Sequence, residues 1–320
     1  MREGVIVRLT DSAGRVGYGE AAPVPGFSRE TAPQIVASLS RSSREKGAVI
    51  GPVPEKFASL RWALDCAQAM IAGGFSPLSR AEALPVAALL PAGAAARAAL
   101  ARYTAEGYRA FKWKIATGAV RDECRWLDAL LARLPAGAKL RLDANGGLDA
   151  KEFSQWTKHL RALGKAAQVI EFFEQPFSPA HTPAQWAAQR RRANDAPVPV
   201  ALDESVTGLA AMRAARWPGP LVVKPSLLGD LADFLRWRAR RKPDLVYSSA
   251  FETSVGLHAA LWLAATDAHA GKRAVGFGTL AAFADDGLQL PAHAPGPTLT
   301  PTPLSADDFA DLWNRLPTPG

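Results

Sequence analysis

The sequence predicts an α/β protein in which a repeating β/α barrel follows a smaller N-terminal α+β unit. From about residue 85 onward, short apolar runs alternate with longer segments rich in Ala, Leu, Arg and Trp, as parallel strands alternate with helices. Five charged residues also stand near the ends of apolar runs, 29, 31, 29 and 21 residues apart, an interval that holds one strand, one helix and two loops. These residues are Lys114, Asp143, Glu174, Asp203 and Lys224.

Length and composition agree with this architecture. The chain has 320 residues, and a barrel of about 250 residues leaves room for one smaller domain. Its 48% hydrophobic and 21% charged content is ordinary for a soluble protein, and no long uncharged apolar run predicts a membrane span. The N-terminus has no signal-peptide pattern, and Cys66 and Cys124 have neither metal-ligand nor redox spacing. We therefore expect a reduced, cytoplasmic protein without a membrane partner.

The formal net charge of +8 raises the question of a nucleic-acid partner. The basic runs at residues 190–192 and 236–242 are short and close predicted helices, where the helix dipole favours cations. Solvated helix ends explain these runs, so we expect no nucleic-acid partner. A positive field also suits an anionic small-molecule substrate, while the oligomeric state stays unknown from the sequence.

The N-terminal unit, residues 1–84, is predicted to be a hairpin followed by helices. A Pro- and Gly-rich loop should separate the two parts. A two-stranded hairpin is marginal alone and normally has a third strand, so we expect the first strand of this unit to be missing. The predicted elements are strands at 5–10 and 16–20, a loop at 21–28, and helices at about 29–42 and 54–73.

Residues 85–285 contain eight candidate strands, the number in a closed β/α barrel. Several are continuous apolar runs, as expected for parallel strands covered by helices. After the barrel, Pro-rich sequence leads to a last helix with Ser305 as its N-cap, and we expect residues 286–320 to pack back on the N-terminal unit. The candidate strands are 86–90, 110–115, 140–143, 169–174, 198–202, 221–223, 245–248 and 275–277.

Three of the five charged residues are candidate metal ligands. Asp143, Glu174 and Asp203 would each offer a hard oxygen from one of three successive strands, which suits octahedral Mg²⁺ better than zinc. Acidic residues at such places also cap barrel helices, but three in register beside two lysines favour the metal. Of two competing acids, Glu171 should lie within its strand, and Glu204 should point away from the barrel axis if Asp203 points toward it.

The lysines are candidate acid–base groups. Lys112 and Lys114 share one side of their strand, because side chains alternate with period two. A solvated edge strand would explain them less well, since Phe111 and Trp113 on the other side should face helices. Lysines inside a barrel are costly unless they are used or paired. Lys114 is therefore a candidate base, and Lys224 should approach from the opposite side of the ring.

Several short motifs together resemble the muconate-lactonizing-enzyme subgroup of the enolase superfamily. Within it, residues 224–230 and 248–257, and the loop at 17–28, resemble the o-succinylbenzoate synthases. The resemblance covers nearly the whole chain and implies a modified TIM barrel of the (β/α)7β type with an N-terminal capping domain. The motifs are Lys112-x-Lys114, Asp143-x-Asn145, Glu174-Gln-Pro, Asp203-Glu-Ser and Lys224-Pro.

The resemblance implies a carbon–oxygen lyase of menaquinone biosynthesis. Its reaction would be the Mg²⁺-dependent syn-dehydration of 2-succinyl-6-hydroxy-2,4-cyclohexadiene-1-carboxylate to 2-succinylbenzoate, with Mn²⁺ as a substitute metal. Asp143, Glu174 and Asp203 would hold the metal against the ring carboxylate. Lys114 would remove the α-proton and then protonate the departing hydroxyl, while Lys224 would stabilise the enediolate intermediate.

Further residues are expected to support the site or bind the substrate. Arg141 could serve a substrate carboxylate or the surroundings of Lys114, and a structural ion pair is an equal alternative. Two serines and the backbone near the last strand should receive the succinyl group, and the capping loop should cover the substrate. The supporting set is Lys112, Arg141, Asn145, Ser248, Ser249, Gly276, Phe27 and Ser28.

Two other functions remain open at this stage. Opposed lysines also suit an N-acylamino-acid racemase or a dipeptide epimerase, but the Asp-x-Asp of the epimerases is replaced here by residues 276–278, which contain no acid. A barrel that merely binds a ligand would not need two lysines across a metal. The chain also starts one strand late for a capping domain, which predicts either a misassigned start codon or a trimmed domain.

Overall fold

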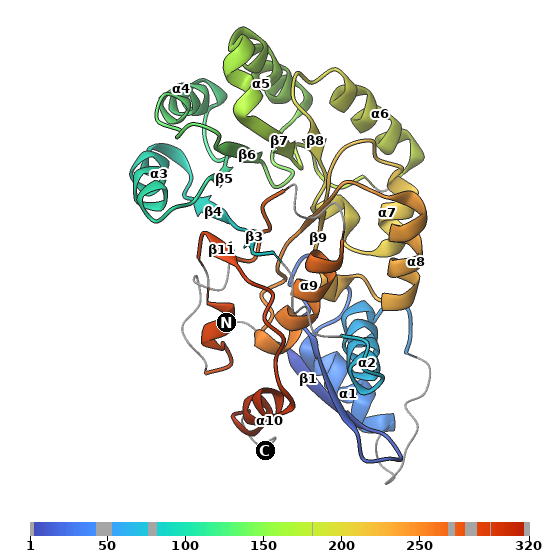
Figure 1. Ribbon diagram of the computed structural model, residues 1–320. Helices are drawn as coiled ribbons and strands as arrows, with labels where there is room; N and C mark the ends of the chain where they lie inside the picture. The colour runs from blue at the N-terminus through green and yellow to red at the C-terminus, as the bar shows by residue number, and fades with distance from the viewer. Residues whose placement is uncertain are drawn as a thin grey trace.

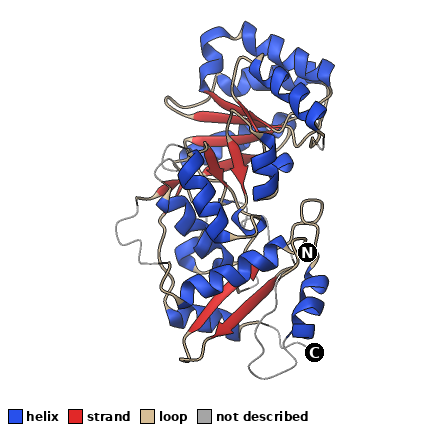
Figure 2. Cartoon of the chain, turned by 90° about the vertical axis from the view of Figure 1, so that its right-hand side faces the viewer, coloured by secondary structure: helices blue, strands red, loops and turns tan. Residues whose placement is uncertain are grey.

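The fold is the predicted α/β barrel with a small N-terminal capping unit (Figure 1). The computed structural model describes residues 3–42, 53–75, 82–180, 182–267, 273–278, 287–294 and 296–316. Figure 2 shows the strands of the capping hairpin at one end of the molecule and the barrel strands toward the other. Among the described residues, none of the helices has both the length and the apolar character needed to cross a membrane.

The capping unit is a hairpin covered by helices. Strands β1 (Val5–Thr10) and β2 (Val16–Ala21) pair antiparallel, and helices α1 (Ala32–Ser42) and α2 (Ala58–Ile71) follow. Asp11 stabilises the turn because its carboxylate accepts hydrogen bonds from two backbone N–H groups. A small core of its own joins the strands to the helices: Val7, Ala21, Ile35, Phe57, Leu60, Ala63, Leu64 and Ala67.

Helix α2 lies directly on β2 because two glycines leave no side chain between them. A Cβ atom on Gly17 would lie 2.0 Å from the carbonyl oxygen of Ala67, and one on Gly19 would lie 1.9 Å from that of Ala63. Neither distance is physically possible without moving backbone. The two glycines therefore set how close the helix comes to the sheet.

The barrel is a closed ring of eight strand positions. Strands β4 to β8 form one parallel sheet, and β9 pairs with β10. Single bridges close the ring, from Leu202 to Leu221, from Ser248 to Gly276, and from Val275 to Val86. The segment around Val275 thus takes the eighth position without a long strand. The strands are β4 (Ala87–Leu90), β5 (Ala110–Lys114), β6 (Lys139–Asp143), β7 (Ile170–Glu174), β8 (Val200–Ala201), β9 (Leu221–Val223) and β10 (Leu245–Tyr247).

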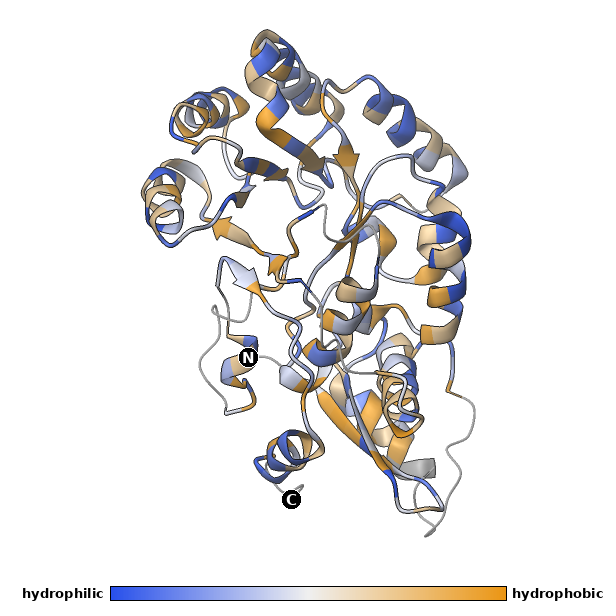
Figure 3. Cartoon of the chain, in the orientation of Figure 1, coloured by the Kyte–Doolittle hydropathy of each residue, from blue (hydrophilic) through white to orange (hydrophobic). Residues whose placement is uncertain are grey.

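A helix follows each of the first seven strand positions, so the predicted (β/α)7β order is confirmed. Asp149 and Thr182 begin α5 and α6 with capping boxes, and α6 has Pro in its first turn. In Figure 3 the strands are largely hydrophobic, while hydrophilic residues lie along α6 and α8. The helices are α3 (Ala96–Ala105), α4 (Val120–Leu131), α5 (Ala150–Ala162), α6 (Pro183–Asn194), α7 (Leu209–Ala215), α8 (Leu231–Arg241) and α9 (Ser254–Thr266).

The C-terminal segment returns to the start of the chain. Strand β11 (Thr298–Leu299) pairs with β3 (Leu84–Pro85), just before the barrel begins. Helix α10 (Ala306–Asn314) stacks Phe309 on Tyr18 of the hairpin, with ring centroids 5.5 Å apart. Trp313 of the same helix also contacts the Tyr18 ring, so the two ends of the described chain share a small apolar cluster.

One buried carboxylate joins the capping unit to the barrel. Glu20 on β2 is 2% exposed and accepts hydrogen bonds at the start of α9, from the backbone N–H of Thr253 at 2.9 Å and of Gly256 at 3.0 Å. The hydroxyl of Thr253 also donates to Glu20 at 2.5 Å. A carboxylate at a helix N-terminus satisfies free N–H groups and complements the helix dipole.

The close approach at Gly19 predicts a large loss of stability in a Gly19→Ala variant. Because the new methyl group would overlap the backbone of α2, we expect the free energy of unfolding to fall by about 3 kcal/mol. Urea unfolding at neutral pH measures the change. Gly118→Ala is the control, since a Cβ there meets nothing within 4 Å and should change stability by less than about 0.5 kcal/mol. Equal stability of the two variants would contradict the packing argument.

Candidate active site

The five charged residues identified by spacing lie at one rim of the barrel. Lys114, Asp143 and Glu174 are the last residues of β5, β6 and β7, and Asp203 and Lys224 follow β8 and β9. Because parallel strands in a closed ring end on the same side, their carboxyl-terminal residues face a common space. The ring thus brings together groups that are up to 110 residues apart in the sequence.

Lys112 joins two of the carboxylates. Its Nζ lies 2.8 Å from Asp143 Oδ2 and 2.7 Å from Glu174 Oε1. Burial works against the charged form of Lys112, but the carboxylates of Asp143, Glu174 and Asp203 raise the pKa of its ammonium group above the usual value. Lys112 is therefore a fixed positive charge in this arrangement.

Lys224 joins the third carboxylate to the capping loop. Its Nζ forms an ion pair with Asp203 Oδ1 and lies 4.7 Å from the centroid of the Phe27 ring. Ser28 holds the same loop in shape, because its hydroxyl accepts a hydrogen bond from the backbone N–H of Val24 at 2.9 Å. The predicted capping-loop residues therefore reach Lys224, and the aromatic face gives its ammonium a cation–π partner.

Lys114 is exposed at the rim and is held by a side-chain amide. Its Nζ lies 2.5 Å from Asn145 Oδ1, and Asn145 Nδ2 donates to Glu204 Oε1 at 2.8 Å. The expectation that Glu204 points away from the barrel axis is wrong. Strand β8 ends at Ala201 and Glu204 begins a 3-10 turn, so the alternation of a strand does not extend to it.

Arg141 forms a structural ion pair. Its side chain is buried, donates from Nε to Glu171 Oε2 at 2.6 Å and from Nη2 to the carbonyl of Ala274 at 2.6 Å. Arg273 donates to the other oxygen of Glu171 at 2.8 Å. Glu171 is thus neutralised near the start of β7, away from the end that carries Glu174.

A small cavity of about 40 Å³ lies inside the ring beside Lys112 and Glu174. Gly276 lines it and leaves room for the Ser248 side chain, because a Cβ there would lie 2.6 Å from the hydroxyl oxygen of Ser248. Ser249 does not line this cavity, and its hydroxyl donates to Glu252 at 2.8 Å instead. The lining residues are Ala87, Leu89, Lys112, Arg141, Glu174, Val222, Val246, Ser248, Gly276 and Gly278.

Gln175 is a part of the site that the sequence analysis named only as the middle residue of a motif and to which it gave no role. It is fully buried, and its Oε1 accepts from the backbone N–H groups of Asp203 at 3.0 Å and Ser205 at 3.1 Å. Its Nε2 donates to Ser205 Oγ and to the carbonyl of Phe177, each at 2.7 Å. Gln175 therefore ties the end of β7 to the end of β8. The sequence feature that could have indicated this role is a side-chain amide directly after the candidate metal ligand Glu174.

The donor set fits a hard divalent cation. Burial, opposed by Lys112 and reinforced by Asp143 and Asp203, raises the pKa of Glu174 to about 8. The three acids are buried at one rim, and they offer only oxygen atoms. Among the described residues, no three His, Cys, Asp or Glu side chains lie close enough together to coordinate a metal ion. The carboxylates instead contact the ammonium groups of Lys112 and Lys224.

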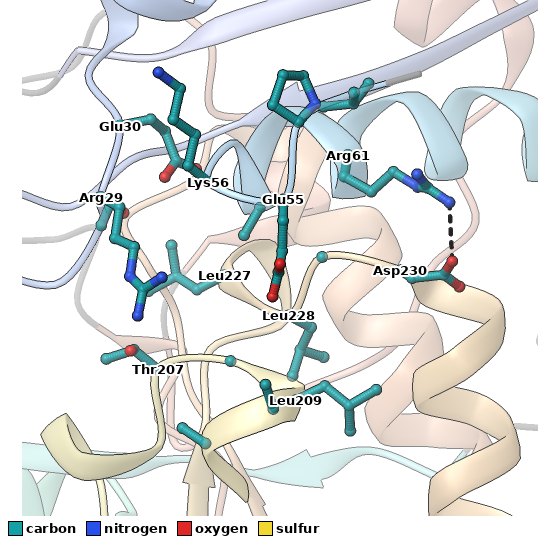
Figure 4. A pocket seen from close by; sticks show the side chains of 18 of the residues that line it. Arg29, Glu30, Glu55, Lys56, Arg61, Thr207, Leu209, Leu227, Leu228 and Asp230 are labelled. Carbon is teal, nitrogen blue, oxygen red and sulfur yellow. Dashed lines mark hydrogen bonds and ion pairs between the residues drawn. The ribbon is translucent and has the colours of Figure 1, made fainter. Parts of the chain in front are cut away.

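A second cavity, of about 480 Å³, lies between the capping unit and the barrel (Figure 4). The side chains of Arg29 and Glu55 extend from the capping unit toward the barrel loops, and Arg61 pairs with Asp230 at 3.0 Å on one edge. Phe27 lines this cavity and also contacts Lys224. The capping loop therefore links the cavity to the rim, and the volume is sufficient for a small molecule.

The chain is similar to known proteins in both of its parts. Residues 1–71 match the family profile described as MenC, N-terminal domain, and residues 94–216 match the profile described as Enolase C-terminal domain-like. A curated o-succinylbenzoate synthase from Thermosynechococcus vestitus is 37% identical over 264 residues, which cover 79% of this chain and 78% of that protein.

Solved structures agree with this relationship. The o-succinylbenzoate synthase from Thermosynechococcus elongatus BP-1, complexed with Mg in its active site, superposes with a TM-score of 0.77 and 33% identity. The match covers 98% of this chain and 92% of that one. The L-Ala-D/L-Glu epimerase from Bacillus subtilis has a TM-score of 0.70 at 20% identity and covers 88% of this chain and 83% of its own. That second likeness shows the fold alone.

The role of Gln175 predicts that a Gln175→Leu variant will be destabilised by about 2–4 kcal/mol, because it leaves buried N–H groups at Asp203 and Ser205 without partners. Chemical unfolding measures the change, and the exposed Gln155→Leu on α5 is the matched control. If both variants unfold at the same denaturant concentration, Gln175 does not tie the two strands together.

Proposed function

The chain belongs to the o-succinylbenzoate synthase family of the enolase superfamily, and on this premise we propose how its residues perform the dehydration. The substrate would be 2-succinyl-6-hydroxy-2,4-cyclohexadiene-1-carboxylate and the product 2-succinylbenzoate, in menaquinone biosynthesis. The observation that supports this most is the rim itself. Lys114 and Lys224 stand on different sides of three carboxylates, so a base and a second cation can face one bound anion.

Asp143, Glu174 and Asp203 would hold Mg²⁺, and we expect Mn²⁺ to substitute for it. When bound, the metal supplies positive charge to the substrate carboxylate at the moment the α-proton leaves. This assignment is supported by the oxygen-only donor set and by the burial of all three carboxylates at one rim. Lys112 keeps Asp143 and Glu174 together, so that their free oxygens are positioned in advance.

Lys114 is the proposed base. Its exposed ammonium end lies at the rim, and only Asn145 holds it among the contacts of the described residues, so in its neutral form it can take the α-proton. The resulting ammonium then protonates the departing hydroxyl on the same face, which gives syn elimination. The C–H and C–O bonds break, the new double bond completes the aromatic ring, and water leaves.

Lys224 has a different proposed role. Its ammonium, paired with Asp203 and lying over Phe27, would stabilise the negative charge that develops on the substrate. The small cavity beside Ser248 and Gly276 is the proposed place for part of the succinyl group. Leu89, which is 41% exposed on β4 and lines that cavity, offers an apolar contact for the carbon skeleton.

We also propose that the enzyme works in the cytoplasm on an anionic substrate. Cys66 and Cys124 are both buried and unpaired, which supports a reducing compartment. The racemase and epimerase alternative is not favoured, because the epimerase likeness is limited to the fold while the synthase relatives match in sequence.

The direct test is the conversion of the cyclohexadiene substrate, followed as loss of diene absorbance. We expect rapid conversion with Mg²⁺, no conversion with excess chelator, and recovery when Mg²⁺ or Mn²⁺ is returned, since the metal carries the charge stabilisation. A folded, metal-supplied protein that leaves the diene unchanged would refute the proposed function. Full activity in chelator would refute the role of the three carboxylates.

The base assignment predicts that Lys114→Ala will lower kcat by about 10²- to 10⁴-fold. Mg²⁺ binding, measured by calorimetry, should remain, because Lys114 contacts Asn145 and none of the three carboxylates directly. Lys158→Ala, an exposed lysine on α5, serves as the control and should keep the full rate. Retained turnover in the Lys114 variant would remove this lysine from the mechanism.

A further inference from the structure

The proposed base is connected to an acid that has no part in the mechanism so far. Lys114 Nζ donates to Asn145 Oδ1, and Asn145 Nδ2 donates to Glu204 Oε1 at 2.8 Å. The other oxygen of Glu204 is buried and has no partner among the described residues. Among the described residues, the Glu204 side chain therefore makes one hydrogen bond to another side chain. Its partner is the Asn145 amide that contacts Lys114.

The backbone around Asn145 is already fixed by other groups. Asn145 has a φ of +43°, in the left-handed region, and its N–H donates to Asp143 Oδ1 at 3.1 Å. The N–H of Gly146 donates to the carbonyl of Gln175 at 2.7 Å. Main-chain contacts thus place the Asn145 side chain at the rim, but they do not decide which end of its amide faces Lys114.

The direction of that amide matters for a base. A neutral lysine amine has two N–H donors and one lone pair, and the lone pair must be free to take the α-proton. When Asn145 presents its oxygen, it accepts one N–H of Lys114 and leaves the lone pair available. When Asn145 presents its NH₂, that group donates into the lone pair and blocks it.

We propose that Glu204 is a positioning residue that keeps Lys114 competent as a base by fixing the direction of the Asn145 amide. The carboxylate oxygen accepts only from the NH₂ end, so the oxygen end must face Lys114. This inference rests on the proposed function, because it assigns Glu204 a purpose only if Lys114 removes a proton. Glu204 acts through Asn145 and touches no reacting atom.

Two substitutions of Glu204 separate this role from its charge. Glu204→Gln and Glu204→Leu both remove the negative charge, but only Gln keeps an oxygen that can accept from Asn145 Nδ2. We expect Glu204→Leu to have a kcat about 10- to 100-fold below that of Glu204→Gln, with similar KM values, because the lysine is misdirected while the substrate still binds.

Asn145→Gly tests whether the effect passes through the amide. Glycine accepts the left-handed φ without strain and Asn145 is exposed, so this variant should fold. In the Asn145→Gly background the Leu and Gln variants of Glu204 should have the same kcat. The inference would be overturned if the kcat values of the two Glu204 variants still differed in the Asn145→Gly background. It would also be overturned if they were equal when Asn145 is present.

The holoenzyme with Mg²⁺ is used throughout, and wild-type turnover is measured first. An inactive wild type means that the proposed function has failed, and the inference fails with it. An active wild type with equal Leu and Gln variants means that the inference alone has failed. If urea unfolding shows that Glu204→Leu does not fold, Glu204→Ala replaces it with the same expected kinetics, and Asn145→Gly alone should still lower kcat.

Discussion

Three buried carboxylates at the rim of the barrel require positive charge beside them. Asp143, Glu174 and Asp203 are all nearly buried, and each is held by an ammonium group from Lys112 or Lys224. Carboxylates brought this close are unstable together unless cations share the space. The strands must therefore end in register, and the loops after them must hold the acids against their mutual repulsion.

The loops that follow β5, β6 and β7 contain residues with strained backbone conformations, and hydrogen bonds stabilise these loops. Ala116, Asn145 and Gln175 follow three neighbouring strands and all have positive φ values, which side chains with a Cβ rarely adopt. Hydrogen bonds across the loops offset this cost, among them the four made by the Gln175 amide. Arg216 and Lys242, which end α7 and α8, also have positive φ values, so this strain occurs at helix ends as well as at the rim.

The sequence was sufficient to predict the fold and the rim, because a fixed spacing of charged residues at strand ends leaves few arrangements. The predicted direction of the Glu204 side chain was wrong, because β8 is two residues long and a 3-10 turn follows it. The alternation of side chains along a strand does not apply in that turn. The sequence left Arg141 open between two roles, since only the structure shows that Glu171 and a backbone carbonyl take up its guanidinium. The role of Gln175 was not foreseen because Asp203 and Ser205 lie after the next strand, and contacts of that kind are invisible to local patterns.

The contact of Glu20 with the start of α9 has a consequence for how the chain folds during translation. Glu20 and Thr253 are 233 residues apart in the sequence, so the capping hairpin emerges long before its partner exists. At about 5–20 residues per second, the ribosome needs roughly 10 to 50 seconds to deliver that helix. During this interval a carboxylate meant for a buried site remains in water, and the hairpin has only its own small core. The N-terminal unit of the nascent chain can reach Asp230 and Leu231 through α2 earlier, but it cannot bury Glu20 until α9 has been made.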